Sequence, residues 1–418
     1  MKAPEAPEAP PLTHPAWSQR ANLYQVNLRQ FTPEGTFAAF RAHLPRLAAM
    51  GVDILWLMPI HPVGARQRKG SLGSPYAVAD HLTVNPDFGT LADFRALVRA
   101  VHEAGMRLIL DWVANHTAWD HVWVQAHPER YLKNARGEIE SFRYDNGRAV
   151  EAWTDVVGLD WRQPAVWDAM QEAMAFWVRE AGIDGYRCDV AGLVPLAFWE
   201  RARAALEAAK PVFMLAEWSA PELHARAFDM SYDWDLYDAM KAIASGQGDA
   251  RTLAAYLARS AATWPADAYR MLFTGNHDKN AWEGHDAEVF GPAFRACATL
   301  AATLPGMPLI YGGQESGLDR RLAFFERDPI DWKSYVYARF YARLLALKHR
   351  HPALANGAAG APAQVLATDS DTAFAFRREL PGDAVAVVVN LSARAQCLSV
   401  DSIPGSVHLG PWGWHIQE

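Results

Sequence analysis

Short apolar segments alternate with helical patterns from residue 23 to residue 350, and this alternation is the feature that most constrains the fold. Eight segments have the length and apolar content of buried strands, and segment 228–231 is the weakest of them. The expected strands are 23–28, 52–58, 107–113, 185–189, 212–217, 228–231, 268–273 and 308–311. Repeated strand–helix units predict a parallel sheet, and eight of them predict a closed (β/α)8 barrel with its active site at the carboxyl ends of the strands.

The helical segments carry their own start and stop signals. Thr90 and Asp93 have the spacing of a capping box. Leu91 begins a run of apolar residues at helical spacing that continues to Val101, and Gly105 follows as a stop signal. The expected helices are 91–101, 164–181, 195–209, 233–246, 286–304 and 332–350. Most of them lie between consecutive strands, as a barrel of this kind requires.

Two segments interrupt the alternation. Residues 118–163 are polar, rich in Trp and Asp, and without long periodicity, which predicts an inserted loop domain after the third strand. Residues 353–418 contain short strands with no helices between them, which predicts a C-terminal antiparallel β-sandwich. The fold class is therefore α/β, with a TIM barrel over 16–352. Residues 1–15, which contain five prolines, are expected to form a flexible tail.

Composition excludes several classes of function. The net charge is −7 with both signs interspersed, so neither a nucleic-acid partner nor a membrane partner is expected. The longest uncharged stretch, 296–314, is interrupted by prolines and glycines and does not read as a membrane span. Cys188, Cys297 and Cys397 are too far apart for a disulfide framework or a metal cluster. The first fifteen residues lack the apolar core of a secretory signal, which favours the cytoplasm.

Polar residues gather at the ends of four of the expected strands. In chain order they are Asp111, Asn115 and His116, then Arg187 and Asp189, then Glu217, and finally Asn276, His277 and Asp278. One buried carboxylate at a strand end is often structural. Several carboxylates at one face repel one another and are costly to desolvate, so the set indicates an active site rather than packing.

The carboxylates suggest two chemical roles. Arg187 and Asp189 lie two apart on one strand and face the same way, so the guanidinium is expected to lower the pKa of Asp189, which suits a nucleophile. Glu217 has apolar neighbours in sequence, which are expected to raise its pKa, and this suits a general acid. Two carboxylates of different pKa are what glycoside cleavage requires. His116 and His277 are candidates to donate hydrogen bonds to sugar hydroxyls, and their spacing does not suggest a catalytic zinc.

These residues resemble the conserved regions of the α-amylase family of retaining glycoside hydrolases, glycoside hydrolase family 13, over nearly the whole chain. Four segments occur in the family's order, and a fifth resembles its eighth-strand signature. They are 111–116 (DWVANH), 182–189 (GIDGYRCD), 215–217 (LAE), 273–278 (FTGNHD) and 306–315 (GMPLIYGGQE).

The resemblance implies a role for each candidate residue. Asp189 is implied to be the nucleophile, Glu217 the acid/base, and Asp278 the third carboxylate, which holds sugar hydroxyls. The residues implied to bind the sugar at the cleavage point are Arg187, His116, His277 and Tyr76, of which Tyr76 resembles the family's stacking tyrosine.

The chain departs from the family at a few positions. Ala216 stands where glycine is common in the family, and a methyl group is expected to fit at this position. Gly192 and Leu193 occupy the places of a Lys-His pair found in many extracellular amylases, which puts a backbone calcium ligand in doubt. Asn115 matches a calcium ligand of the family, although its amide could equally hydrogen-bond a loop. We therefore expect no required cofactor and leave a structural calcium open.

The expected function is hydrolysis of α-1,4-glucosidic bonds in maltooligosaccharides and in starch- or glycogen-derived α-glucans, by double displacement with retention. An α-glucosidase or a 4-α-glucanotransferase on the same scaffold is the alternative, because the first intermediate is the same and only the acceptor differs. A non-catalytic sugar-binding or transporter-associated homologue is the remote alternative. The sequence does not determine chain-length preference, linkage preference or oligomeric state.

Overall fold

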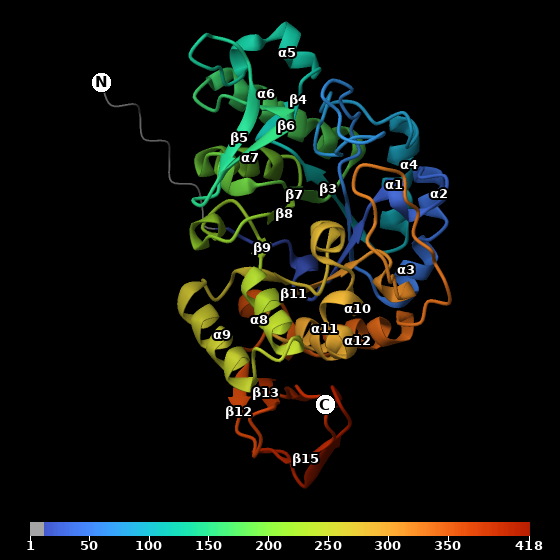
Figure 1. Ribbon diagram of the computed structural model, residues 1–418, viewed down its shortest axis with the longest axis vertical. Coiled ribbons are helices and arrows are strands. Elements are labelled where there is room, and N and C mark those ends of the chain that lie inside the picture. Colours follow the sequence, from blue (N-terminus) through green and yellow to red (C-terminus); the bar gives the residue numbers. More distant parts are fainter. Residues whose placement is uncertain (1–11) are drawn as a thin grey trace, which may run out of the picture.

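A closed barrel of eight parallel strands forms the centre of the molecule in the computed structural model, which describes residues 12–418 (Figure 1). The hydrogen-bonded order around the barrel is β1-β11-β10-β9-β8-β7-β3-β2. The strands are β1 (Leu23–Val26), β2 (Ile54–Leu57), β3 (Arg107–Trp112), β7 (Gly185–Cys188), β8 (Phe213–Ala216), β9 (Met230–Tyr232), β10 (Tyr269–Leu272) and β11 (Met307–Tyr311). All eight predicted strands are present, and the predicted barrel is confirmed.

Helices surround the barrel and cover the outer faces of its strands (Figure 1). They are α1 (Leu28–Phe31), α2 (Phe37–Arg41), α3 (Leu44–Met50), α4 (Leu91–Glu103), α6 (Pro164–Phe176), α7 (Leu196–Glu207), α8 (Trp234–Ala244), α9 (Ala250–Thr263), α10 (Asp286–Val289), α11 (Phe294–Thr303) and α12 (Ala338–Arg350). The predicted capping box at the start of α4 is present, with Thr90 and Asp93 each bonding the other's backbone N–H.

Two of the predicted helices differ from the structure, and one helix was not predicted. The helix expected over 286–304 is divided into α10 and α11 at Gly291, which has φ of +51°, and the proline that follows it cannot continue a helical ladder. The helix expected over 332–350 begins only at Ala338. Helix α9 was not predicted, although Asp249 caps it and its apolar residues Leu253, Tyr256 and Leu257 lie at helical spacing.

The segment between β3 and α6 forms a separate antiparallel sheet. Its strands are β4 (His116–Ala118), β5 (Ser141–Asp145) and β6 (Val150–Gly158), in the order β4-β6-β5, and it also contains α5 (Val122–Ala126). Its inner residues, including Ala118 and Val156, pack against Ala77 of the loop that follows β2. Figure 1 shows this segment at one end of the molecule and the C-terminal strands at the other.

The C-terminal residues form two antiparallel sheets, as predicted. A four-stranded sheet has the order β12-β13-β14-β17, and β15 pairs with β16 in a second sheet. The strands are β12 (Gln364–Leu366), β13 (Ala373–Leu380), β14 (Asp383–Asn390), β15 (Gln396–Ser399), β16 (Ser406–Leu409) and β17 (Trp414–Gln417). The two sheets share an apolar core that includes Ala375, Val388 and Leu398. The short strands β12 and β16 were not predicted.

A flexible tail was predicted for residues 1–15, of which the structure describes residues 12–15. Residues 1–11 lie outside the described part of the chain. His14 packs against the barrel, and its Nδ1 lies 2.8 Å from Oδ1 of the buried Asp229. Among residues 12–418, no helix is both long enough and apolar enough to cross a membrane.

Candidate active site

The register of three neighbouring strands brings the predicted catalytic residues together. Arg187 on β7 lies directly between Asp111 on β3 and Leu215 on β8. Side chains alternate along a strand, so Asp189 and Glu217, each two residues further on, emerge on the same inner side as Arg187 and Leu215. Both carboxylates therefore lie at the carboxyl end of the barrel.

Gly185, at the start of β7, is required by the close approach of β8. Its φ is +149°, and a Cβ built there would lie 1.8 Å from the backbone oxygen of Phe213. Any side chain at this position would push the two strands apart, so the glycine maintains the spacing between the strands that carry Asp189 and Glu217.

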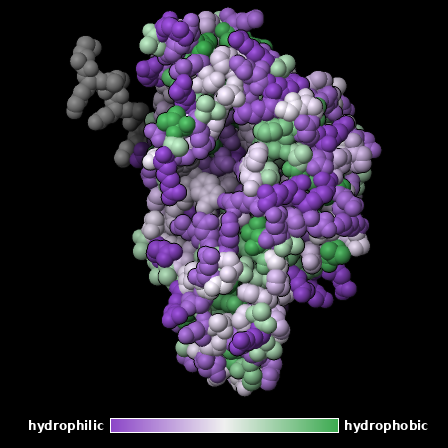
Figure 2. All heavy atoms as spheres, viewed as in Figure 1, coloured by the Kyte–Doolittle hydropathy of each residue, from purple (hydrophilic) through white to green (hydrophobic). Residues whose placement is uncertain are grey.

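A polar cavity of about 300 Å³ lies over these strand ends. Figure 2 shows a hollow in this region, surrounded by a mostly hydrophilic surface. Six of the seven predicted site residues line the cavity: Tyr76, His116, Asp189, Glu217, His277 and Asp278. The seventh, Arg187, is fully buried and contacts both Asp189 and Glu217. The structure thus brings the whole predicted set into one place.

The guanidinium of Arg187 is shared by three carboxylates. Its Nη1 lies 2.7 Å from Oδ1 of Asp111 and 2.9 Å from Oδ1 of Asp189, and its Nη2 lies 2.6 Å from Oε1 of Glu217. Asp111 and Arg187 are completely buried. One cation thus compensates a cluster of negative charge that would otherwise repel itself in a low-dielectric site.

The predicted electrostatic division between the two catalytic carboxylates is wrong. Burial, followed by the nearby Glu217 carboxylate, holds the pKa of Asp189 well above its usual range, although Arg187 acts in the opposite direction. Glu217 is not in an apolar setting, because it is ion-paired with Arg187 and also accepts a hydrogen bond from the backbone N–H of Val190 at 2.8 Å. Asp189 therefore retains its proton to a higher pH than an isolated carboxyl would.

Val190, directly after Asp189, has a strained backbone. Its φ of 38° and ψ of 47° lie in the left-handed region, which is unfavourable for a β-branched residue. This conformation turns the Val190 N–H toward Oε2 of Glu217. The strain therefore holds the acid/base candidate in place, and nothing in the sequence signals it.

A hydrogen-bonded chain fixes the residues on the opposite side of the cavity. Nε2 of His277 lies 2.8 Å from the hydroxyl of Tyr76, which donates to Oδ2 of Asp111 at 3.0 Å. Nε2 of His277 also lies 3.2 Å from Oδ2 of Asp278. Burial, reinforced by Arg187, lowers the pKa of His277 to about 3, so the ring is neutral at ordinary pH.

His116 is held as a neutral donor in the same cavity. Nδ2 of Asn115 lies 3.1 Å from Nδ1 of His116, which leaves Nε2 of the ring to carry the hydrogen. Burial lowers the pKa of His116 to about 4. The ring packs edge-to-face on Trp153, with their centroids 5.5 Å apart.

Aromatic side chains complete the wall of the cavity. The Phe324 ring is stacked at 6.3 Å on Tyr76, and Trp282 packs on Phe324 at 5.5 Å. Trp282 is 58% exposed, an unusual position for so large an apolar group. Flat aromatic faces beside polar hydrogen-bonding groups suit a ring that is apolar on its faces and polar at its edges.

The family model for the alpha amylase catalytic domain matches residues 18–332, which include every catalytic candidate. The chain belongs to the alpha-amylase family. The match ends before α12 and the C-terminal sheets, so it is the barrel and its inserted segment that define the membership.

Alpha-amylase structures share this fold. An alpha-amylase from Lactobacillus plantarum superposes with a TM-score of 0.85 at 29% identity, covering 96% of this chain and 100% of that chain. AmyB, a noncanonic maltogenic alpha-amylase from Thermotoga neapolitana, superposes with a TM-score of 0.82 at 26% identity, covering 95% and 96%.

Curated relatives include a hydrolase and a transferase. Alpha-amylase MalA of Haloarcula japonica is 28% identical over 394 residues, which is 92% of this chain and 57% of that protein. The alpha-1,4-glucan:maltose-1-phosphate maltosyltransferase of Rhodospirillum rubrum is 34% identical over 304 residues, which is 67% of this chain and 42% of that protein. The chain spans about half the length of these relatives.

Asn115, which stands where the alpha-amylase family places a calcium ligand, does not fit a calcium site in this chain. It lines a separate surface cavity of about 350 Å³, whose one lining carboxylate among the described residues is Asp160. Arg162 binds both oxygens of that carboxylate, at 2.7 and 3.0 Å, and the Asn115 amide faces His116. A cation would have to displace the guanidinium, whereas Ca²⁺ prefers six to eight oxygen ligands.

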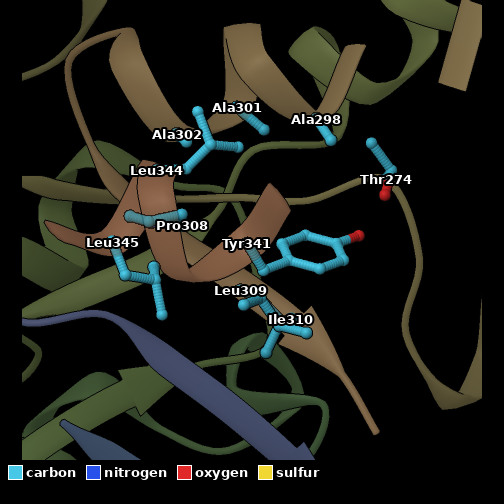
Figure 3. A pocket seen from close by; sticks show the side chains of 10 residues that line it. All are labelled: Thr274, Ala298, Ala301, Ala302, Pro308, Leu309, Ile310, Tyr341, Leu344 and Leu345. Atoms are coloured by element: carbon cyan, nitrogen blue, oxygen red, sulfur yellow. The ribbon is translucent and has the colours of Figure 1, made fainter. Parts of the chain in front are cut away.

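One internal cavity, beside β11, is too small to hold a sugar. The space between β11, α11 and α12 is about 10 Å³, roughly enough for one water, and Figure 3 shows Leu344, Leu345 and Tyr341 closing it against the alanines of α11. We regard it as a packing gap of the core.

Several residues of the site were not identified from the sequence. They are Gln25, Lys69, Trp153, Asp155, Val190, Trp282, Phe324 and Phe325. All but Gln25 line the cavity, and Gln25 contacts His277 from below. Four of them, Lys69, Val190, Phe324 and Phe325, lie in loops, where no periodicity shows which side chains face one another. From the sequence, Trp153 and Trp282 are among the tryptophans near strand ends that could stack on sugar rings, but packing is the favoured interpretation for most of them, and no chemistry is expected of Phe324-Phe325.

Proposed function

We propose that this protein hydrolyses α-1,4-glucosidic bonds in maltooligosaccharides and related α-glucans, with retention of anomeric configuration. The observation that carries the proposal is the placement of Asp189 and Glu217 on either side of one buried guanidinium, in a polar cavity with neutral histidine donors. A pair of neighbouring carboxyl groups supplies the nucleophile and the acid that the reaction needs.

In the first step, Asp189 attacks the anomeric carbon while Glu217 gives its proton to the leaving glycosidic oxygen. The bond to the leaving sugar breaks as the bond to Asp189 forms, which produces a glycosyl ester. Asp189 loses its negative charge as the ester forms, and Glu217 becomes negatively charged as it gives up its proton, so Arg187 remains paired with Asp111 and with the ionised Glu217. Asp278 and His277 are placed to hold sugar hydroxyls beside the reacting carbon.

In the second step, Glu217 removes a proton from water, and the resulting oxygen attacks the anomeric carbon and releases Asp189. Two inversions give net retention. The Val190 N–H and Arg187 orient the Glu217 carboxylate for this second role, because both contact its oxygens when it is ionised.

Proton NMR of the first product tests the proposal. Hydrolysis of maltooligosaccharides should release the α-anomer first, and chromatography should show shorter maltooligosaccharides. A β-anomeric first product would overturn the double displacement, and absence of turnover would favour a non-catalytic sugar-binding protein.

Glycosyl transfer is the second candidate function, favoured by the 34% identity to a maltosyltransferase. The glycosyl ester on Asp189 is common to both reactions, and only the acceptor that attacks it differs. Incubation with a labelled maltooligosaccharide acceptor separates them. Longer labelled chains would indicate an α-glucanotransferase, and free reducing sugar alone would indicate hydrolysis.

We also propose that the enzyme works without calcium and in a reducing compartment such as the cytoplasm. Calcium independence is supported by Arg162, whose guanidinium forms an ion pair with the carboxylate of Asp160 beside Asn115. A reducing compartment is supported by the three free thiols, of which Cys397 is exposed. Fractionation of cells with an antibody to the protein would test the compartment.

A further inference from the structure

The loop between β2 and α4 contains a segment, residues 64–74, that we call the strap. It begins beside the inserted sheet and ends beside the loop that follows β11, and it is fixed on both sides. Arg29 of α1 also holds its end, by donating to the backbone oxygen of Gly73 at 2.8 Å. The strap is therefore a fixed part of the wall of the catalytic cavity.

The first attachment joins the strap to the inserted segment. Nζ of Lys69 lies 2.7 Å from Oδ1 of Asp155 on β6, and the backbone N–H of Ala65 donates to Asp120 at 2.7 Å. Asp155 is only 5% exposed, and both Lys69 and Asp155 line the catalytic cavity. Separating the pair would leave a buried carboxylate without its cation, which is costly.

The second attachment joins the strap to the loop that follows β11. The backbone N–H of Leu72 donates to the backbone oxygen of Phe325 at 3.1 Å, and the N–H of Ser71 donates to Glu326 at 2.8 Å. Phe324 and Phe325 lie in the cavity wall just beyond this junction. The inserted sheet, the strap and the β11 loop thus form one continuous wall.

The order of the barrel strands indicates which end of the substrate lies against this wall. In the ring of eight strands, β8 lies opposite β1, and β2 and β11 flank β1. Glu217, directly after β8, protonates the leaving oxygen, so the leaving part of the substrate lies toward β8. The wall built on the β2 and β11 loops is therefore on the other side, where the non-reducing part of the substrate lies.

We propose that the strap closes the non-reducing end of the site, so that the enzyme releases short units from the non-reducing ends of α-glucan chains instead of cleaving within them. The inference rests on the proposed function and adds which part of a chain is the substrate. A chain cleaved internally would have to pass through this wall, by breaking the Lys69–Asp155 pair. A cavity of about 300 Å³, at the lower limit of ligand sites, suits a short terminal unit.

The test compares two p-nitrophenyl α-maltoheptaosides, one with a free non-reducing end and one blocked there with a 4,6-O-ethylidene group. The wild type should cleave the free substrate with one short product from the first minutes, and the blocked one roughly 100-fold more slowly, because the blocking group clashes with the wall. Comparable rates on both, or mixed products from the start, would overturn the inference.

Variants then locate the closure. Lys69→Ala should reduce the preference for the free end about tenfold or more. Asp155→Asn, which keeps the shape of the side chain and removes its charge, should act in the same direction and serves if Lys69→Ala folds poorly. Arg136→Ala is the matched control, because Arg136 forms an exposed ion pair with Glu138 in the same inserted segment. Its preference should equal that of the wild type.

The remaining outcomes are also decisive. If the wild type prefers free ends and both strap variants retain that preference in full, the Lys69–Asp155 pair does not close the site and the inference is wrong. If neither heptaoside nor α-glucosyl fluoride is hydrolysed, the proposed function itself fails. Hydrolysis of the fluoride therefore separates failure of the inference from failure of the function.

Discussion

Gln25, on β1, holds His277 through both ends of its amide. Its Nε2 lies 2.7 Å from Nδ1 of His277, and its Oε1 accepts the backbone N–H of His277 at 3.2 Å. Because the carbonyl end is already used, Nε2 must donate to Nδ1, which places the ring hydrogen on Nε2. That hydrogen faces Tyr76 and Asp278, where the sugar is proposed to bind.

Replacing Gln25 should therefore impair catalysis without removing any group that touches substrate. In Gln25→Leu, His277 loses the donor to Nδ1, and we expect kcat/KM to fall about tenfold, equivalent to about 1.4 kcal/mol, within the usual cost of a broken buried hydrogen bond. In Gln25→Glu, a carboxylate beside Nδ1 should favour the imidazolium and shift the pH profile of kcat/KM. An unchanged profile in Gln25→Glu together with full activity in Gln25→Leu would contradict this positioning role.

The two carboxylates proposed as catalytic should respond differently to removal. Glu217→Ala should retain most of the first step on α-glucosyl fluoride, which needs no protonation, whereas natural glucans should lose about 10²–10⁴-fold, the usual contribution of acid/base assistance. The glycosyl-enzyme should accumulate, and added azide should convert it to an α-azide. Mass spectrometry and product NMR measure both effects.

Asp189→Ala provides the opposite pattern. Without the nucleophile no covalent intermediate forms from either substrate, and azide could give only the β-azide, by attack from the vacated face. A trapped glycosyl-enzyme in Asp189→Ala, or an equal loss on both substrates in Glu217→Ala, would reverse the assignment of roles.

Sequence reasoning predicted that the candidate catalytic residues lie together, because the ends of apolar strands can be recognised in the sequence. Residues such as Asp189 and Glu217 directly follow short apolar strands, and parallel strands in a barrel bring their carboxyl ends together. The pairing of Arg187 with Asp189 also followed from their spacing of two, since alternate side chains share a face. These inferences need only local periodicity and the closure of the barrel.

Contacts between neighbouring strands and between separate loops could not be predicted from local periodicity in the sequence. Glu217 was assigned an apolar environment from its sequence neighbours, but Arg187 reaches it from the adjacent strand. Lys69 of the strap and Asp155 on β6 meet although they lie in two separate segments, and no pattern within either segment predicts the contact. The electrostatics of the site thus depend on contacts between residues far apart in the sequence, and local sequence patterns do not predict these contacts.

Chelation gives a direct test of calcium independence. Because Arg162 already binds the Asp160 carboxylate and Asn115 is directed to His116, we expect excess EDTA to leave both turnover and the thermal midpoint unchanged. Calorimetry with and without EDTA, followed by added CaCl₂, measures this. A fall of many degrees on chelation, restored by calcium, would reveal a structural cation.

Three buried histidines beneath the inserted segment should make the protein sensitive to acid. Nε2 of His81 donates to the backbone oxygen of Val113 at 2.8 Å, so its Nδ1 accepts from Nε2 of His121 at 3.0 Å. His61 packs beside His81 with centroids 5.9 Å apart. Burial lowers the pKa of His61 to about 3 and that of His81 to about 4, and it lowers the pKa of His121 well below its usual value.

The sign of the effect follows from these lowered pKa values. Each histidine stays neutral in the native state and takes up a proton on unfolding once the pH is below about 6.5, so the unfolded state binds more protons and stability falls as the pH falls. For His61 alone, whose native pKa is about 3, linkage predicts that the free energy of unfolding falls by about 2 kcal/mol between pH 7 and pH 5.

Replacing His61 by Phe should remove this contribution. Between pH 7 and pH 5, the free energy of unfolding measured with urea should therefore fall by about 2 kcal/mol less in His61→Phe than in the wild type. His415→Gln, at an exposed position on β17, is the control and should leave the pH dependence as it is. Equal pH dependence in His61→Phe and the wild type would mean that His61 is protonated in the native state, contrary to its burial.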